Sequence, residues 1–227
     1  MKRFLLIALL GLLFLPENAV AQRRKRPQPV KLGMTYGFKL GANFASMPGF
    51  AAEASGNKQS FSQRIGPVGG GLLNYRFTSL LSMQLEALYS PRGTKITTTG
   101  ISSGRVTEEV IKLTYVDVPV LLKANAKVFY GEAGIVPSLL VDQKYAETTV
   151  KRESTPNDVK SLDVGFGIGA GIEAPQGAFF GVRYVRSTSA IGQGGIFNQL
   201  GGKDVENSVV QVTGGYIFGK STGRRRR

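Results

Sequence analysis

The chain has 227 residues, and its 29 lysines and arginines against 15 aspartates and glutamates give a formal net charge of +14. It contains no cysteine and no histidine, so the commonest metal ligands and every histidine-based catalytic dyad or triad are excluded. We therefore expect no enzyme, no cofactor and no metal site. Glycine is abundant, at 30 residues.

The first element in the chain is a predicted secretory signal peptide, residues 1–21. Two basic residues precede an apolar run, Phe4–Leu15, that is too short to span a membrane as a helix. Ala19 and Ala21 place small side chains where a signal peptidase cleaves. A short N-terminal anchor is the alternative, but it needs a longer apolar run. No later apolar stretch has the length of a transmembrane helix, so a membrane role would have to use β-strands.

The basic charge is concentrated in two tails, residues 22–32 and 220–227, each of which carries five positive charges. With a net charge of one on the signal peptide, the tails account for eleven of the fourteen charges, so the body between them is nearly balanced. Solvated tails, a clamp on anionic phospholipid and a dock for an acidic periplasmic partner all agree with this pattern. Nucleic acid is not an expected partner, because no aromatic residues are interleaved for stacking. Besides Lys31 and Lys220, the basic residues of the tails form two runs: Arg23, Arg24, Lys25, Arg26, Arg224, Arg225, Arg226 and Arg227.

Residues 33–219 alternate between apolar and polar side chains with period two, which predicts β-strands rather than helices. The clearest alternation runs through residues 161–174, where every second residue from Leu162 to Ile172 is apolar and the residues between them are mostly glycine. Eight strands are predicted, at residues 35–45, 65–77, 82–95, 107–124, 128–141, 161–174, 178–186 and 207–218.

The connections between these strands alternate between long and short. Tight turns are expected near Thr78, near Asn125-Ala126 and at residues 175–177. Long loops are expected at residues 46–64, 97–106, 142–160 and 187–206. This alternation is typical of bacterial outer-membrane barrels, which have short periplasmic turns and long external loops. We therefore predict an all-β fold: a single closed up-and-down antiparallel transmembrane β-barrel of about eight strands, with both termini in the periplasm.

The two faces of the strands favour a membrane barrel over a soluble one. Glycine dominates the polar face of residues 161–174, and a narrow barrel interior needs such small residues beside large ones. Aromatic residues near the strand ends suit a membrane–water boundary. They are Tyr36, Phe44, Tyr75, Phe77, Tyr89, Tyr184, Tyr216 and Phe218. The alternative is a soluble eight-stranded barrel of lipocalin type, with the apolar face inward.

Charges on an inward polar face should be paired, because an unpaired charge in a confined interior costs several kcal/mol. A network of paired charges would fill the lumen and exclude a wide pore. The alternative is that the same network forms a proton or ligand site. Glu132 is a further acidic candidate. The predicted lumen network comprises Lys39, Arg76, Glu86, Arg92, Asp117, Lys123, Asp163, Glu173 and Arg183.

Several segments resemble the PorT-type outer-membrane β-barrel domain. They are Tyr36–Phe44 (YGFKLGANF), Leu85–Gly93 (LEALYSPRG), Leu113–Lys123 (LTYVDVPVLLK), Val164–Glu173 (VGFGIGAGIE) and Gly181–Tyr184 (GVRY). The resemblance implies an eight-stranded barrel in the outer membrane. The founding member of that family is tied to type IX secretion. This chain lacks the longer Arg/Asn-rich segment that follows the central strand of the secretion protein.

Together these features predict a small non-enzymatic outer-membrane barrel with a structural or assembly role, accessory to type IX-like protein secretion. The expected partners are outer-membrane lipid and periplasmic or secretion-machinery proteins, and the barrel itself is expected to be monomeric. The alternative is a barrel that binds or transports a small molecule.

Overall fold

The computed structural model describes residues 32–49, 53–54, 57–100, 104, 106–147, 152–154, 159–188, 190 and 205–219. The predicted signal peptide and, apart from Leu32, both basic tails lie outside these residues. No helix long and apolar enough to cross a membrane occurs in the described part of the chain.

Eleven strands in the described residues form one sheet, and all of their pairings are antiparallel. The strands are β1 (Gly33–Ser46), β2 (Glu53–Ala54), β3 (Asn57–Arg76), β4 (Leu81–Gly100), β5 (Val106–Asp117), β6 (Val120–Ala126), β7 (Phe129–Glu147), β8 (Arg152–Ser154), β9 (Leu162–Glu173), β10 (Ala178–Ser187) and β11 (Ser208–Phe218).

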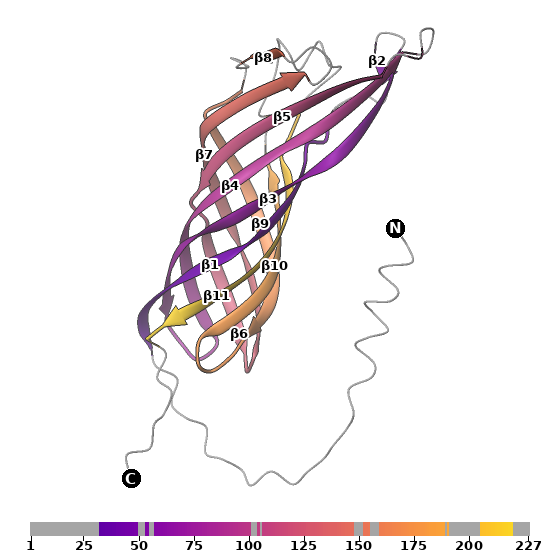
Figure 1. Cartoon of the computed structure of the whole chain (residues 1–227). Coiled ribbons are helices and arrows are strands. Elements are labelled where there is room, and N and C mark those ends of the chain that lie inside the picture. The colour runs from indigo at the N-terminus through magenta and orange to yellow at the C-terminus, as the bar shows by residue number, and fades with distance from the viewer. Residues whose placement is uncertain are drawn as a thin grey trace, which may run out of the picture.

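The sheet closes on itself as a barrel (Figure 1), because β1 pairs with β3 on one side and with β11 on the other. β5 and β6 are two parts of one wall strand, since both pair with β4 and with β7. β2 and β8 are short and pair only with β3 and β7. The ring therefore has eight strands, in the order β1, β3, β4, β5 with β6, β7, β9, β10 and β11. This confirms the predicted fold class.

The break between β5 and β6 falls at Val118 and Pro119. Proline has no N–H to donate to a neighbouring strand. The Pro119 carbonyl nevertheless accepts a hydrogen bond from the Glu86 N–H at 3.0 Å, and the Val118 N–H donates to the Pro137 carbonyl at 2.8 Å. The wall therefore stays hydrogen-bonded across the break.

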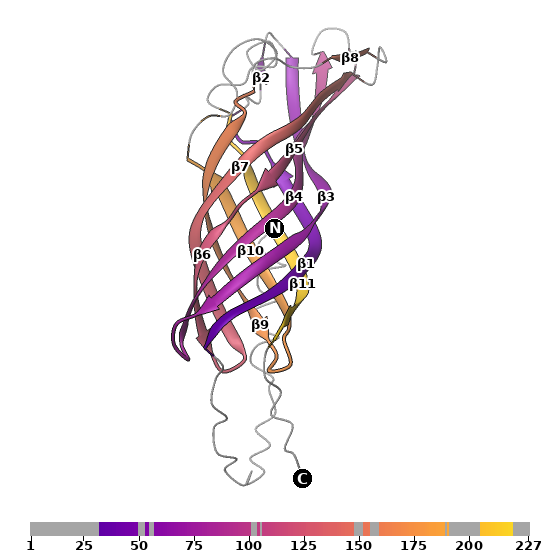
Figure 2. The same cartoon turned by 90° about the vertical axis from the view of Figure 1, so that its left-hand side faces the viewer.

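The strands extend further at one end of the barrel than the sequence predicted. Residues 57–64, 97–100 and 142–147 were expected in loops, and this was wrong, because they continue β3, β4 and β7. Figures 1 and 2 show that these ends lie with β2 and β8, whereas the start of β1 and the end of β11 lie at the other end. We call these the loop end and the turn end. The tight turn expected near Asn125-Ala126 is present and consists of Lys127 and Val128.

The polarity of the barrel wall reverses along the strands. Over the turn-end part, large apolar side chains point outward and are exposed, while charged and polar side chains are buried inside. At the loop end, the inward side chains Ile96, Ile111 and Leu113 are apolar and buried. The outward Lys95 is half-buried, and the outward Lys112 is exposed. An outward apolar band is the mark of a strand that faces lipid. The lipid-facing band therefore covers the turn-end part of the wall.

Candidate functional site

The candidate site is the barrel lumen, because the inward face of the turn-end part carries almost all of the buried charge. All nine residues of the predicted lumen network have partners inside the barrel. Arg76 is the least buried, with 13% of its side chain exposed. The network lies at three levels along the barrel axis.

The middle level joins four strands through Glu86. Lys39 of β1 lies 2.7 Å from Glu86 of β4, and the Arg183 guanidinium of β10 binds both oxygens of the same carboxylate, at 2.7 and 2.8 Å. Glu132 of β7 accepts a further hydrogen bond from Arg183 Nε at 2.8 Å. Because β4 and β10 are opposite in the ring, the pair of Glu86 and Arg183 crosses the lumen.

The upper level, toward the loop end, is built around Arg92 of β4. Its guanidinium lies 2.6 Å from Asp117 of β5 and 3.2 Å from Asp163 of β9. The Asp163 carboxylate also accepts hydrogen bonds from the Ser187 hydroxyl at 2.7 Å and the Asn207 amide at 2.9 Å. One arginine therefore holds two carboxylates from different strands of the wall.

The lower level, near the turn end, contains two cations and one carboxylate. Glu173 of β9 lies 2.5 Å from Lys123 Nζ of β6 and 3.5 Å from Arg76 of β3. Arg76 also donates to the Asn125 side-chain carbonyl at 3.0 Å. The Lys123 ammonium lies 3.9 Å from the centre of the Tyr130 ring, within the range of a cation–π interaction.

The charges of the three levels balance as a set. The middle level is neutral, the upper level has one negative charge more than it has positive, and the lower level has one positive charge more than negative. The ten charged side chains therefore sum to zero. A mixed-sign set of this kind avoids the large cost of an unpaired charge away from water.

Inward glycines of β9 and β10 leave room for larger inward side chains. A Cβ on Gly181 would meet the Tyr130 hydroxyl, and a Cβ on Gly171 would lie 2.6 Å from the same hydroxyl oxygen. A Cβ on Gly169 would lie 3.1 Å from a Glu132 carboxylate oxygen. The glycines that alternate along β9 thus form the wall against which β7 side chains pack.

An apolar cluster lies above the charged levels, at the loop end. Its buried members are Met47, Ile96, Ile111, Leu113, Tyr115, Val159 and Val205, and Phe61 and Leu140 pack against it. Tyr115 joins the cluster to the upper level, because the Arg92 guanidinium lies 4.7 Å from the centre of its ring. We call these nine residues the apolar cap.

The sequence analysis missed several residues that complete the network, and it missed the apolar cap. The polar residues missed are Asn43, Gln84, Asn125, Ser138, Ser187 and Asn207. Each lies on the inward face of its strand or just beyond the strand end, so strict alternation could have found most of them. The eight basic tail residues named above lie outside the described residues.

Several buried polar atoms of the upper level have no protein partner among the described residues. They include Arg92 Nε, Asp117 Oδ2 and Asp163 Oδ1. Buried polar atoms of this kind are the usual binding sites of internal water. No group of three or more metal-ligating side chains occurs in the described part of the chain. The arrangement suits a hydrated, charge-paired interior.

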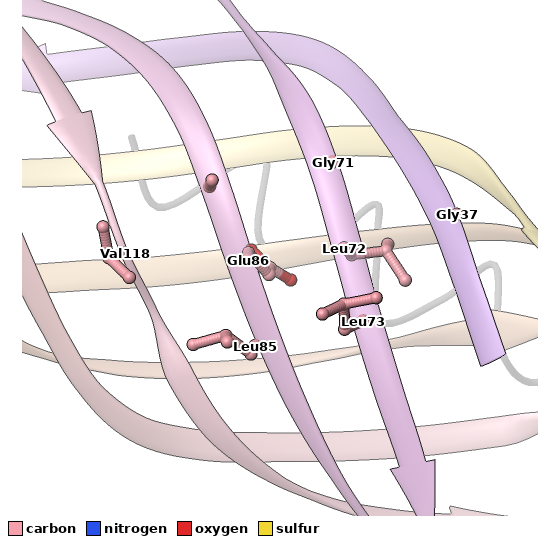
Figure 3. Close-up of a pocket in the computed structure, with 8 residues that line it drawn as sticks. Gly37, Gly71, Leu72, Leu73, Leu85, Glu86 and Val118 are labelled. Atoms are coloured by element: carbon pink, nitrogen blue, oxygen red, sulfur yellow. The ribbon is translucent and has the colours of Figure 1, made fainter. Parts of the chain in front are cut away.

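The outer wall has an apolar groove beside the middle level (Figure 3), with a volume of about 350 Å³. Gly71 of β3 and Ala87 of β4 face each other there, and both are exposed because neither has a large side chain. Leu73, Leu85 and Val118 line the groove around them. We call these five residues the wall groove.

Solved barrels with similar structures differ widely from this chain in sequence. The attachment invasion locus protein Ail of Yersinia pestis, in complex with the heparin analogue sucrose octasulfate, is 11% identical, with 83% of this chain and 100% of Ail covered at a TM-score of 0.46. OprG of Pseudomonas aeruginosa is 15% identical (83% and 97% covered, TM-score 0.39), and Neisserial surface protein A is 13% identical (83% and 99%, 0.41). No curated protein matches the sequence.

The sequence matches one family model over most of its length. That model describes an outer membrane protein beta-barrel domain, and it matches residues 20–191. The match agrees with the closed ring of eight strands and its outward apolar band. The chain therefore belongs to the family of outer membrane protein beta-barrel domains, and its location is the outer membrane.

Proposed function

We propose that the protein is a closed, non-enzymatic barrel with a structural or assembly role in the outer membrane. The observation that carries this proposal is the filled lumen, in which Glu86 and Arg183 join opposite walls beneath the apolar cap. About eight strands leave an interior only wide enough for side chains or one small ligand. A barrel with such an interior acts through its outer wall, its loops and its termini.

The lumen network has a structural role in this proposal. Each charged level ties together strands that are not neighbours in the ring, as Lys123 of β6 and Glu173 of β9 do. Loss of one partner leaves an uncompensated buried charge, which is strongly destabilising. The network therefore serves as a plug and as a set of cross-braces, rather than as a proton or ligand site.

The orientation in this proposal puts the turn end and both termini in the periplasm, after removal of residues 1–21. Short turns on the periplasmic side and long loops outside are the rule for such barrels. The chain has no cysteine, so single introduced cysteines report cleanly on topology. In intact cells, a membrane-impermeant maleimide should label Thr188→Cys at the loop end and not Ser79→Cys at the turn end. The opposite labelling pattern would refute this orientation.

The assembly role extends to protein secretion, as the PorT-type resemblance of residues 113–123 implies. In this proposal the basic tails, residues 22–32 and 220–227, dock an acidic periplasmic partner. Affinity purification of the full-length protein from outer membranes, with mass spectrometry of bound proteins, is the test. We expect secretion-machinery proteins to co-purify with the wild-type protein. They should no longer co-purify when Arg224–Arg227 are replaced by glutamine. Unchanged partners in that variant would refute docking by the C-terminal tail.

A small-molecule transport barrel is the competing function. It requires a path through the lumen, and the charged levels and the apolar cap lie across that path. Ion conductance in planar bilayers distinguishes the two functions.

A further inference from the structure

A row of basic side chains crosses the outer wall at the loop end of β3, β4, β5 and β7. Gly93 of β4 is opposite Lys112 of β5, and Lys112 is opposite Lys144 of β7. Arg64 of β3 fills the place beside the glycine, since its Cδ lies 3.2 Å from the position of a Cβ on Gly93. We call Arg64, Lys112 and Lys144 the basic row.

The basic row contains two lysines directly opposite each other on one face of the sheet. Like charges at directly opposite positions of antiparallel strands are destabilising. Two other cations at this end have carboxylate partners: Lys95 pairs with Glu108 at 2.9 Å and Arg186 with Glu206 at 3.0 Å.

By comparison, the positive charges of the basic row have almost no carboxylates close enough to neutralise them. Among the described residues, no carboxylate lies within 4.0 Å of Lys112 or Arg64, and Lys144 has only Asp142, at 4.0 Å. The half-buried Arg64 donates a hydrogen bond to the backbone carbonyl of Arg92 at 2.5 Å, which does not neutralise its charge. The two exposed lysines therefore present most of the row's positive charge to an anion from outside the chain.

The basic row lies just beyond the lipid-facing band. On the same strands, Tyr89, Val116 and Leu139 form an outward apolar row, and Tyr89 and Leu139 are 52% and 51% exposed. On β7 the apolar surface continues to Val141, which is 58% exposed and lies between Leu139 and Lys144. Lys112 lies four residues beyond Val116, or about 13 Å along the strand. Because the strands of such barrels are tilted by about 35–45°, Lys112 lies about 10 Å beyond Val116 along the barrel axis. Lipid headgroups border the apolar band on this side, so the basic row is in position to contact them.

The wall groove continues the same surface on the other side of that apolar row. Ala87 lies two residues from Tyr89 toward the turn end of β4, and Val118 immediately follows the end of β5, two residues from Val116. The groove is lined almost entirely by apolar side chains and the carbon atoms of glycine. In order from the loop end, strands β3 to β7 therefore present cations, an apolar row and an apolar groove.

We propose that this surface binds a phosphorylated lipid, with the phosphate on the basic row and an acyl chain in the wall groove. Lys112 and Lys144 contact the phosphate oxygens, whose charge removes the repulsion between the two ammonium groups. Assignment of the lipid to the outer leaflet rests on the proposed orientation, whereas the binding itself does not.

Native mass spectrometry of the full-length protein in mild detergent, titrated with lipid, tests the proposal. The probes are a diphosphorylated glycolipid of the lipid A type, its monophosphorylated form, phosphatidylcholine and inorganic phosphate. We expect the diphosphorylated lipid to bind more tightly than the other three. Each lysine near an anionic lipid surface contributes about a fivefold change in affinity. Lys112→Gln with Lys144→Gln should therefore weaken binding about 25-fold.

Two further variants separate the headgroup from the chain. Gly71→Leu adds a side chain where the nearest atom to the Cβ is 4.0 Å away, so it fills the wall groove without a clash. It should weaken lipid binding and leave inorganic phosphate binding unchanged. The matched control is Lys58→Gln. Lys58 is an exposed lysine of β3 that lies opposite β2 and outside the basic row, so its replacement should leave lipid binding unchanged.

The faster migration of a folded barrel on unheated gels verifies that each variant is folded. Replacement of Lys112 and Lys144 removes the repulsion between them, so it should not lower the stability of the barrel. Wild-type lipid affinity in the double lysine variant would overturn the proposal. Equal affinity for inorganic phosphate and the lipid would reduce the site to a simple anion site and would also overturn it.

Discussion

Glu86 and Arg183 form a two-point ion pair across the lumen, with nitrogen–oxygen distances of 2.7 and 2.8 Å. They come from β4 and β10, which three ring strands separate in either direction. The wall of the barrel is thus braced through its interior as well as by its strand ladders. Because Glu86 also binds Lys39, one carboxylate neutralises parts of two cations.

Replacement of Glu86 by leucine should destabilise the barrel strongly. Lys39 then loses its carboxylate partner, and Arg183 keeps only Glu132. Removal of one partner from a buried ion pair costs about 3–5 kcal/mol. Urea unfolding of the refolded barrel in lipid vesicles measures this loss. The double variant Glu86→Leu with Arg183→Leu should lose less than the sum of the two single variants.

The exposed pair of Arg186 and Glu206 is the matched control. Its nitrogen–oxygen distance is also short, at 3.0 Å, but the Arg186 side chain is 58% exposed. Surface ion pairs contribute about 0–1 kcal/mol. A loss in Glu206→Gln as large as that in Glu86→Leu would contradict the distinction between lumen and surface pairs.

Gly181→Ala should destabilise the barrel by about 1–3 kcal/mol, because the added methyl group meets the Tyr130 hydroxyl. Tyr130→Phe removes that oxygen and should restore much of the stability. Gly171→Ala is the control: the atom nearest to its Cβ is the Phe180 carbonyl oxygen, which Tyr130→Phe does not remove. Equal rescue of both alanine variants would contradict the steric argument.

Ile111→Ala in the apolar cap should cost about 2–5 kcal/mol, as is typical when a large side chain is removed from a packed core. Ile111 is only 1% exposed. Ile135→Ala removes the same groups from the outward face of β7, where the side chain is 45% exposed, and lipid can fill the space. It should cost clearly less in the same urea titration. Similar losses would mean that the cap is not a packed core.

Much of the wall was predictable because the lipid-facing part of each strand alternates strictly. β9 and β10 begin and end within one residue of the prediction, since apolar residues such as Phe166 and Val182 all point outward. The inward charges followed from the same alternation, because each charged residue faces away from its apolar neighbours.

The loop-end extensions were not predictable in this way, because the polarity reverses within a strand. In β4, the outward residues are apolar up to Tyr89, whereas beyond Arg92 the apolar residue is the inward Ile96. When the apolar residues change from the outward to the inward face within one strand, the period-two pattern of the sequence is interrupted. Such a segment is predicted as a loop, although its backbone stays extended. On β7 the inward face also mixes polar and apolar residues, since it contains the buried Val136 as well as Glu132, which the sequence named as a further acidic candidate.

Single-channel recording of the purified full-length barrel in planar bilayers tests the closed lumen most directly. Insertion is verified beforehand by the heat-dependent mobility of the reconstituted protein. Paired charges at three levels and the apolar cap lie across the lumen, so the account predicts no conductance steps above the bilayer background. Reproducible ion-conducting steps from the wild-type barrel would contradict it.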